Sequence, residues 1–340
     1  MSSYPQAPIT RGRTGIRRRD ILKLGAAGVL GGPLLLAPVG AARAASGDKL
    51  TIGAIIYARD SQFWQQIERG MRDAAKANGA ELLVGMNRRQ LPVESQLVDD
   101  YMTRNVDALI VPPLDKQGTE AAAKLAKAKG IMVVEYDTQL ADKSIASHSI
   151  GVDSFALASA VGKEMHDYIE KQLKGAASIG LISLPPMNAN SGPRRDGMLK
   201  ALSDVKLKVV AEVSGSTPEQ GANGLENILQ RDPHTQIVWA SNAGTVAGAA
   251  VAATRSKAEA RLYGIDMSQE LASMLLDPKS NLAAVADQQP YRVGYLAVET
   301  AVKAKRGSNE KRYVMVPPKL YTREDPASVK QYLDLVKSLS

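Results

Sequence analysis

Cysteine is absent from this chain of 340 residues, and aromatic side chains are scarce, at 4% of the composition. The lack of cysteine excludes disulfide bonds, thiol catalysis and metal sites with cysteine ligands. The 3 histidines are scattered and lack the spacing of a metal site. There is no phosphate-binding loop, no serine nucleophile elbow and no nucleophile paired with a base. The sequence therefore predicts neither an enzyme nor a bound metal or cofactor.

Residues 1–44 differ in composition from the rest of the chain and predict an export signal. Three arginines and an aspartate at 17–20, followed by an apolar pair and Lys23, form the pattern of a twin-arginine signal. The apolar stretch 24–39 is rich in glycine and alanine and contains two prolines, which suits a signal better than a spanning helix. We expect cleavage near Ala44 and a periplasmic location. An uncleaved anchor helix and a disordered basic arm are the alternatives.

The formal net charge of +8 comes mostly from this signal, which holds seven basic residues and one acidic residue. The remainder of the chain therefore carries only about +2, and its charge gives no reason to expect nucleic-acid binding. After the signal no apolar run reaches the length of about 18 residues that a spanning helix needs. We expect the mature chain not to be embedded in a membrane.

From Lys49 onward, short β-branched apolar runs alternate with amphipathic stretches, which predicts an α/β fold with parallel sheets. In a first series the expected strands are 50–57, 81–85, 108–111 and 131–136, with helices over 63–78, 92–104 and 116–129. In a second series the expected strands are 178–184, 207–213, 236–240, 262–265 and 282–286, with helices over 157–174, 194–202, 218–229, 245–255 and 270–276. Two further helices are expected over 291–305 and 329–339.

This repetition predicts two similar lobes, each a parallel sheet flanked by helices. The first lobe would comprise residues 48–151 and 288–316, and the second would comprise 152–287 and 317–340. Three segments near Gly151, Gln288 and Val316 would then join the lobes as a hinge, because each marks a break between strand series or a return after a helix.

Polar and aromatic residues stand directly after many of the expected strands. In open parallel sheets, ligands bind at the carboxyl ends of the strands, where loops and helix N-termini converge. This rule selects Tyr57 to Trp64, Asp137-Thr138, the loop from Pro185 to Arg195 with Asn190, Ser241-Asn242, Asp266 and Asp287-Gln288. Carboxylates and amides bind hydroxyl groups, and aromatic faces cover the apolar side of a sugar ring. The set favours a small polyhydroxylated ligand.

A series of motifs over nearly the whole mature chain resembles the periplasmic sugar-binding proteins of the ribose- and galactose-binding type. The motifs are Gln62-Phe63-Trp64, Gly70, Asp137 after Val133-Val134, Arg194-Arg195-Asp196-Gly197-Met198, Trp239-Ala240-Ser241-Asn242, Tyr263-Gly264-Ile265-Asp266, Gln288-Gln289-Pro290, Gly294 and Glu299. The resemblance implies a type I periplasmic binding protein fold, shared with the effector domain of the lactose repressor. It also implies a monosaccharide or polyol as ligand, and the permease and ATPase of an ABC importer as partners.

Taken position by position, the resemblance implies that Phe63 and Trp64 stack on the ligand. The hydrogen-bonding residues would be Asp137, Asn242, Asp266 and Gln288, with Tyr57, Thr138, Asn190 and Arg194 as further candidates. Three positions depart from the ribose-type pattern. Thr138 and Gly192 stand where that pattern usually has arginines, and Ala243 stands where it usually has an acid. These differences disfavour ribose, because they remove hydrogen-bonding groups for particular hydroxyls.

Each candidate also has a structural alternative. Because adjacent helical positions face different ways, we expect one residue of Phe63-Trp64 to point inward and at least one to line a cleft. The side chains of Asp137, Asn242 and Asp266 could instead be helix N-caps. Arg194 could be structural or a substitute ligand contact. The competing function on the same fold is a periplasmic sensing subunit that presents its closed form to a receptor kinase or chemoreceptor.

Overall fold

The computed structural model describes residues 49–339. The predicted signal peptide, residues 1–44, lies outside the described residues, so the twin-arginine signal and its cleavage site stay predictions. Within the described part of the chain, no helix is both long enough and apolar enough to cross a bilayer.

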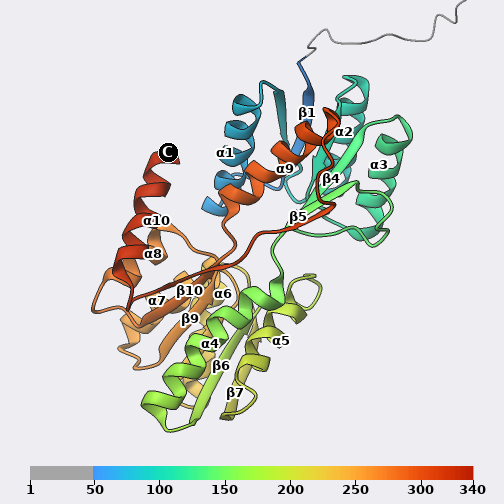
Figure 1. Cartoon of the computed structure of the whole chain (residues 1–340). Coiled ribbons are helices and arrows are strands. Elements are labelled where there is room, and N and C mark those ends of the chain that lie inside the picture. Colours follow the sequence, from blue (N-terminus) through green and yellow to red (C-terminus); the bar gives the residue numbers. More distant parts are fainter. Residues whose placement is uncertain (1–48, 340) are drawn as a thin grey trace, which may run out of the picture. The chain divides into compact units, whose positions relative to one another are not determined.

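The first sheet contains six parallel strands in the order β11-β5-β4-β3-β1-β2. They are β1 (Thr51–Ile56), β2 (Glu81–Met86), β3 (Ala108–Val111), β4 (Met132–Tyr136), β5 (His148–Gly151) and β11 (Tyr313–Met315). The helices of this unit are α1 (Gln62–Ala77), α2 (Leu91–Thr103), α3 (Lys116–Ala128) and α9 (Pro290–Lys305). One face of the sheet packs on α1 and α9, and the other on α2 and α3 (Figure 1).

The second sheet also contains six strands, in the order β12-β10-β9-β8-β6-β7, and only β12 runs antiparallel to its neighbour. They are β6 (Ala176–Ser183), β7 (Lys206–Ser214), β8 (Ile237–Ala240), β9 (Arg261–Ile265), β10 (Leu282–Asp287) and β12 (Lys319–Thr322). Its helices are α4 (Ser154–Leu173), α5 (Ser191–Ala201), α6 (Pro218–Arg231), α7 (Ala243–Ser256), α8 (Gln269–Leu276) and α10 (Pro326–Leu339). One face packs on α4 and α5, and the other on α6, α7, α8 and α10.

The two sheets share one topology. Without the edge strands β11 and β12, the orders are β2-β1-β3-β4-β5 and β7-β6-β8-β9-β10, so each strand of one sheet has an equivalent in the other. In such doubly wound sheets the ligand-binding crevice lies at the carboxyl ends of the strands. The chain leaves the first sheet after Gly151, returns after Asp287 and leaves again after Met315. The predicted α/β class with two similar sheets is confirmed.

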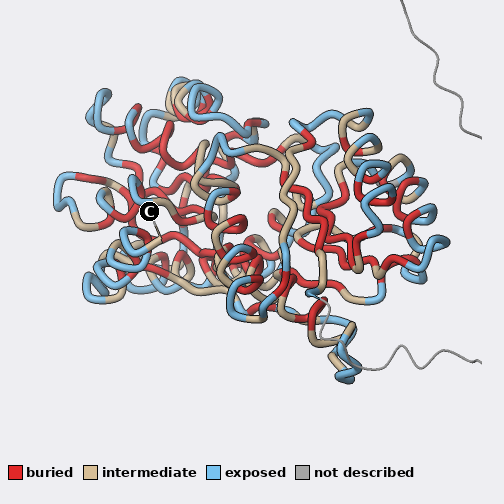
Figure 2. The backbone as a smooth tube through the Cα atoms, turned by 90° about the horizontal axis from the view of Figure 1, so that it is seen from above, coloured by how far each residue is buried: buried red, intermediate tan, exposed pale blue. Residues whose placement is uncertain are grey.

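The strands form the buried layer of each unit, as the red segments of Figure 2 show. Side chains of β1 alternate between the two faces, so that Ala54 packs toward α1 and α9 while Ile55 packs toward α2 and α3. Two motif glycines explain how closely α1 and α9 approach. A Cβ atom at Gly70 would lie 2.0 Å from the carbonyl oxygen of Tyr291, and one at Gly294 would lie 2.1 Å from that of Ile67. Any larger side chain would force the two helices apart.

Short elements account for most differences from the sequence prediction. Residues 150–153 were expected as a crossing, but β5 continues to Gly151 and pairs with both β4 and β11. The three- and four-residue strands β11 and β12 were not predicted, because neither is long enough to show a hydrophobic period. Helix α4 begins at Ser154 rather than at 157, since the carboxylate of Asp153 caps it by accepting from the amides of Phe155 (2.8 Å) and Ala156 (3.1 Å).

Candidate functional site

Two aspartates occupy equivalent positions in the two sheets. Asp137 directly follows β4 and Asp266 directly follows β9, and each donates its backbone N–H to the next strand along, at 3.1 Å to Ile150 and 2.8 Å to Ala286. Both have left-handed backbones, with φ of 63° and 70°. A non-glycine residue in this conformation costs roughly 1–2 kcal/mol. Such strain clusters at functional sites, which favours a ligand role for both residues.

Helix capping does not explain these two aspartates. The N-cap of α8 is Ser268, whose hydroxyl accepts from the amide of Leu271, and not Asp266. Asp137 lies between β4 and β5, where the structure has no helix to cap. The capping alternative for Asp137 and Asp266 is therefore wrong.

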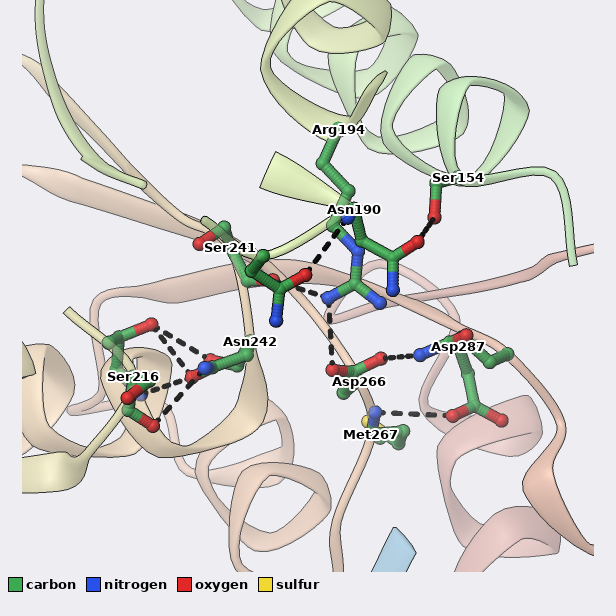
Figure 3. Close-up of polar contacts among 12 residues, drawn as sticks. Ser154, Asn190, Arg194, Ser216, Ser241, Asn242, Asp266, Met267 and Asp287 are labelled. Carbon is green, nitrogen blue, oxygen red and sulfur yellow. Dashed lines mark hydrogen bonds and ion pairs between the residues drawn. The ribbon is translucent and has the colours of Figure 1, made fainter. Parts of the chain in front are cut away.

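Asp266 is held by two side chains, those of Gln288 and Arg194, and Figure 3 shows the contact with Arg194. Gln288 donates from Nε2 to Asp266 Oδ1 at 2.6 Å, and Arg194 approaches Asp266 Oδ2 from Nη1 at 3.3 Å. The same Nη1 donates to the carbonyl oxygen of Ser241 at 2.7 Å. Arg194 is only 3% exposed, and its Nε and the hydroxyl of Ser241 are buried without hydrogen-bond partners. The structure therefore joins three predicted residues, and Arg194 positions Asp266.

The electrostatics of the two aspartates differ. Burial raises the pKa of Asp137 to about 6, the nearby Arg194 guanidinium partly offsets this rise, and the carboxylate of Asp266 adds to it. Its side-chain hydrogen bond comes from Thr138, whose hydroxyl lies 3.3 Å away. The charges of Arg194 and Asp266 thus act on Asp137 from the other sheet. Both aspartates belong to one electrostatic neighbourhood.

Asp287 is a third strand-end carboxylate, which the strand-end rule picks out but to which the resemblance assigns no ligand contact. Burial raises its pKa to about 7, and it accepts from the backbone amides of Met267 (3.2 Å) and Gln289 (3.0 Å). It thereby ties the loop after β9 to the loop after β10 (Figure 3). Its place at the carboxyl end of β10 is the signal that the rule uses. Its contacts make it a support for Asp266 and Gln288.

The predicted aromatic residues cluster at the start of α1. The ring of Trp64 lies 4.5 Å from that of Tyr57, 5.0 Å from that of Phe63 and 6.4 Å from that of Tyr136. Trp64 is buried in the core and is the inward member of its pair, whereas Phe63 is only partly buried. The hydroxyl of Tyr57 donates to the carbonyl oxygen of Pro113 at 2.9 Å. The stacking roles of Phe63 and Trp64, and the ligand role of Tyr57, stay predictions.

Asn242, another predicted site residue, caps a helix. Its Oδ1 accepts from the amide of Thr245 at 2.8 Å, which makes Asn242 the N-cap of α7. Its Nδ2 donates to the carbonyl oxygen of Ser216 at 3.2 Å (Figure 3). Asn242 is therefore a helix N-cap, and its ligand contact stays a prediction.

A pocket of about 350 Å³ lies beside the crossing segments. Its walls are Asp137, Thr138, Gln139, Ser149, Ile150, Gly151, Val152, Asp153, Ser154, Ala189, Asn190, Pro193 and Met315. It thus brings together three predicted residues, Asp137, Thr138 and Asn190, and the other candidates do not line it. The hydroxyl of Ser154 donates to Oδ1 of Asn190 at 3.0 Å (Figure 3). Sequence reasoning missed Ser154, although its place after the first crossing could have indicated it.

Among residues 49–339, no three or more histidine, cysteine, aspartate or glutamate side chains are grouped to hold a metal ion. What the site offers is a set of carboxylates, amides and hydroxyls with one guanidinium. Such groups bind hydroxyl-bearing ligands by donating and accepting hydrogen bonds.

Comparison with known proteins agrees with this geometry. The ribose import binding protein of Bacillus subtilis is 27% identical over 82% of this chain and 90% of its own length. That of Escherichia coli is also 27% identical, over 81% and 92%. Among solved structures, a solute-binding protein of an ABC transporter from Actinobacillus succinogenes with bound D-allose is similar with a TM-score of 0.76, at 23% identity, over 82% of this chain and 100% of that one. A solute-binding protein from Bacillus halodurans with bound myo-inositol is similar with a TM-score of 0.74, at 21% identity, over 85% and 99%.

Residues 52–309 match the family described as periplasmic binding protein domain. This match covers more than half of the chain and includes strands of both sheets. The chain belongs to the periplasmic binding protein family.

Proposed function

We propose that this protein captures a monosaccharide or related polyol between two closing lobes and delivers it to the permease of an ABC importer. The observation that carries the proposal is the pair of strained aspartates, Asp137 and Asp266. They follow equivalent strands of two sheets and share one electrostatic neighbourhood. Lobes built from residues 48–151 with 288–316, and from 152–287 with 317–340, would close by rotation about the three crossing segments.

The chemistry of the candidate residues supports a neutral, polyhydroxylated ligand. Asp137, Asp266 and Gln288 supply hydrogen-bond acceptors and donors, and Phe63 is the partly buried aromatic residue near the start of α1. Relatives named for ribose import, and similar structures with bound D-allose or myo-inositol, point to the same ligand class. Because those relatives are named as import proteins, import is favoured over the sensing alternative.

The remaining parts of the proposal concern location and partners. The protein would be exported by the twin-arginine signal, cleaved near Ala44 and released into the periplasm without catalytic activity of its own. Its partners would be a membrane permease and that permease's cytoplasmic ATPase. Replacing Arg18 and Arg19 together by lysine should leave the precursor in the cytoplasm, as measured by fractionation and immunoblotting. A normal amount of mature protein in the periplasm of that variant would contradict the export proposal.

A thermal-shift screen tests the ligand class directly. A ligand that binds only the folded state stabilises it by mass action, by about 2.7 kcal/mol at 100 times its Kd. We expect at least one pentose, hexose or inositol to raise the Tm of the mature protein, and isothermal titration to give one site per chain. The variant Asp266→Ala serves as the negative control. If no neutral sugar or polyol shifts the parent's Tm while an amino acid or organic acid does, the ligand class is wrong.

A further inference from the structure

The C-terminal helix α10 makes contacts that the binding site does not use. It belongs to the second sheet's unit, yet it and the start of α8 are hydrogen-bonded to α1 of the first unit. The three bonds run from Gln66 Nε2 to the hydroxyl of Tyr332 at 3.1 Å, from Arg69 Nη1 to the carbonyl oxygen of Leu339 at 2.8 Å, and from the amide of Gln269 to Oε1 of Gln62 at 2.6 Å.

These bonds form one continuous stripe on α1. Positions 62, 66 and 69 are four and three residues apart, so their side chains lie on a single helix face. On α10 the two partners are the side-chain hydroxyl of Tyr332 and the backbone carbonyl oxygen of Leu339 in the last turn. The contact therefore joins α1 to α10 at two points and to α8 at a third.

Helix α10 packs into the core of the second unit. Val329 and Tyr332 are buried in its core, and the ring of Tyr332 lies 5.3 Å from that of Tyr321 in β12. On the other side Gln66 is 5% exposed, so its bond to the Tyr332 hydroxyl is sheltered from water. Separating the helices would expose two buried polar groups and break the sheltered bond, and such bonds hold a geometry better than exposed ones.

The interface also lies where lobe rotation would act on it. Helix α1 follows β1 and helix α8 follows β9, so the N-termini that carry Gln62 and Gln269 both lie at the carboxyl ends of strands, as the candidate site does. Any rotation that moves Asp137 away from Asp266 must also displace α1 relative to α8 and α10.

We propose that α10 is a latch, which grips α1 and stabilises the arrangement of the two lobes in which Asp137 and Asp266 lie in one site. Helix α10 lies beyond residue 309, where the family match ends. The latch rests on the two-lobed closure of the proposed function. The ligand binds only the arrangement in which the two aspartates share a site, so its apparent affinity depends on the fraction of protein in that arrangement. The latch changes this fraction and thereby the apparent affinity, without contacting the ligand.

Spin-label distance measurements on the ligand-free protein test the latch. The chain has no native cysteine, so Leu125→Cys in α3 and Val209→Cys in β7, both at exposed positions, give one label on each lobe without background. The variant Tyr332→Phe removes the bonding hydroxyl and keeps the ring. Its control is Tyr321→Phe. The hydroxyl of Tyr321 makes no hydrogen bond among residues 49–339, and its ring packs in the same core.

In Tyr332→Phe we expect a longer inter-label distance to gain population, with a roughly three- to tenfold change in the ratio of the two arrangements, as the loss of one sheltered hydrogen bond implies. Tyr321→Phe should keep the parent's distribution. A parent-like distribution in Tyr332→Phe would overturn the latch, as would an equal change in Tyr321→Phe.

The second variant, Gln66→Ala, makes the test specific to the pair. If the two side chains act through each other, the double variant should shift the distance ratio no further than the larger single change. Additive shifts would also overturn the proposal. Because no ligand is present, these results are separate from the sugar screen: a chain that binds no sugar can still show the latch, and a sugar binder can lack it.

Discussion

Asp137 and Asp266 differ in what surrounds them, although they occupy the same place in two sheets of the same topology. Asp266 accepts from Gln288 at 2.6 Å and faces Arg194, whereas the side-chain hydrogen bond to Asp137 is a 3.3 Å contact with the neighbouring Thr138. Asp266 is thus a carboxylate whose direction is fixed in advance. Asp137 is a partly buried carboxylate whose nearby cation, Arg194, belongs to the other sheet's unit, and burial raises its pKa to about 6.

This difference predicts different roles for the two aspartates in ligand binding. A carboxylate held by fixed donors needs little rearrangement when a ligand arrives, which favours the second lobe as the platform that is prepared in advance. A carboxylate without such donors gains most from a ligand that brings hydroxyl groups to it. Asp137 is then the residue whose environment changes most on closure.

The largest expected effect comes from removing the cation that separates the two cases. In Arg194→Met, Asp266 and the carbonyl oxygen of Ser241 lose their buried partner. Breaking one side of a buried ion pair costs roughly 3–5 kcal/mol, so the free energy of unfolding should fall by about that amount in urea denaturation. The neighbouring Arg195, which pairs with Glu212 at a more exposed site, is the matched control.

For Arg195→Met we expect a loss of roughly 1 kcal/mol or less, because exposed pairs contribute little. Equal losses in the two variants would mean that the burial of Arg194 has no energetic consequence. Arg194 would then not explain why Asp266 and Asp137 differ.

The next effect concerns ligand affinity. Asp137→Ala and Asp266→Ala should each weaken binding by roughly 1–3 kcal/mol, since ligand hydroxyls would be left buried without an acceptor. Calorimetric titration with the ligand found by screening measures this. The same variants should differ in stability: Asp266→Ala leaves Arg194 buried without its carboxylate, whereas Asp137→Ala removes no cation's partner. Parent-like affinity in both variants would remove them from the site.

The pH dependence of stability sharpens the comparison further. The pKa of Asp137 rises from 3.8 to about 6 on folding, so between these pH values the folded state holds a proton that the unfolded state has released. Stability from this group is therefore present at low pH and falls as the pH rises from about 4 to 6. In Asp137→Asn that part of the slope should vanish, and the variant should be more stable than the parent at pH 7 by about 1–3 kcal/mol.

Melting curves from pH 4 to 8 check this expectation. Some slope should remain in the variant, because burial raises the pKa of Asp287 to about 7 and that residue is untouched. Asp60→Asn is a control of opposite sign, since Arg89 lowers the pKa of Asp60 and its contribution to stability is lost as the pH falls. A parent and an Asp137→Asn variant with superimposable curves would show that Asp137 is not desolvated in the folded protein.

These contrasts also show what the sequence could predict. The order of long strands and helices follows from hydrophobic period, and the strand-end rule alone selected Asp137, Asp266 and Gln288. The short strands β11 and β12 could not be predicted, because their pairing partners lie far away in the chain. Nor could the role of Arg194, since a guanidinium at a helix start is equally suited to a ligand or to a neighbouring carboxylate.

The smallest expected effect separates capping residues from site residues at one further pair of equivalent positions. After β8, Asn242 caps α7. After β3, the strand equivalent to β8, Asp115 caps α3 by accepting from the amides of Gln117 (3.1 Å) and Gly118 (2.7 Å). Losing such a cap costs typically about 1 kcal/mol.

Asn242→Ala should therefore lower the free energy of unfolding by about that amount and leave ligand affinity unchanged, and Asn242→Ser should recover most of the loss. Asp115→Ala should behave in the same way in the other lobe. Should Asn242→Ala instead bind ligand as weakly as Asp266→Ala while keeping the parent's stability, Asn242 is a ligand contact and its capping bond is incidental.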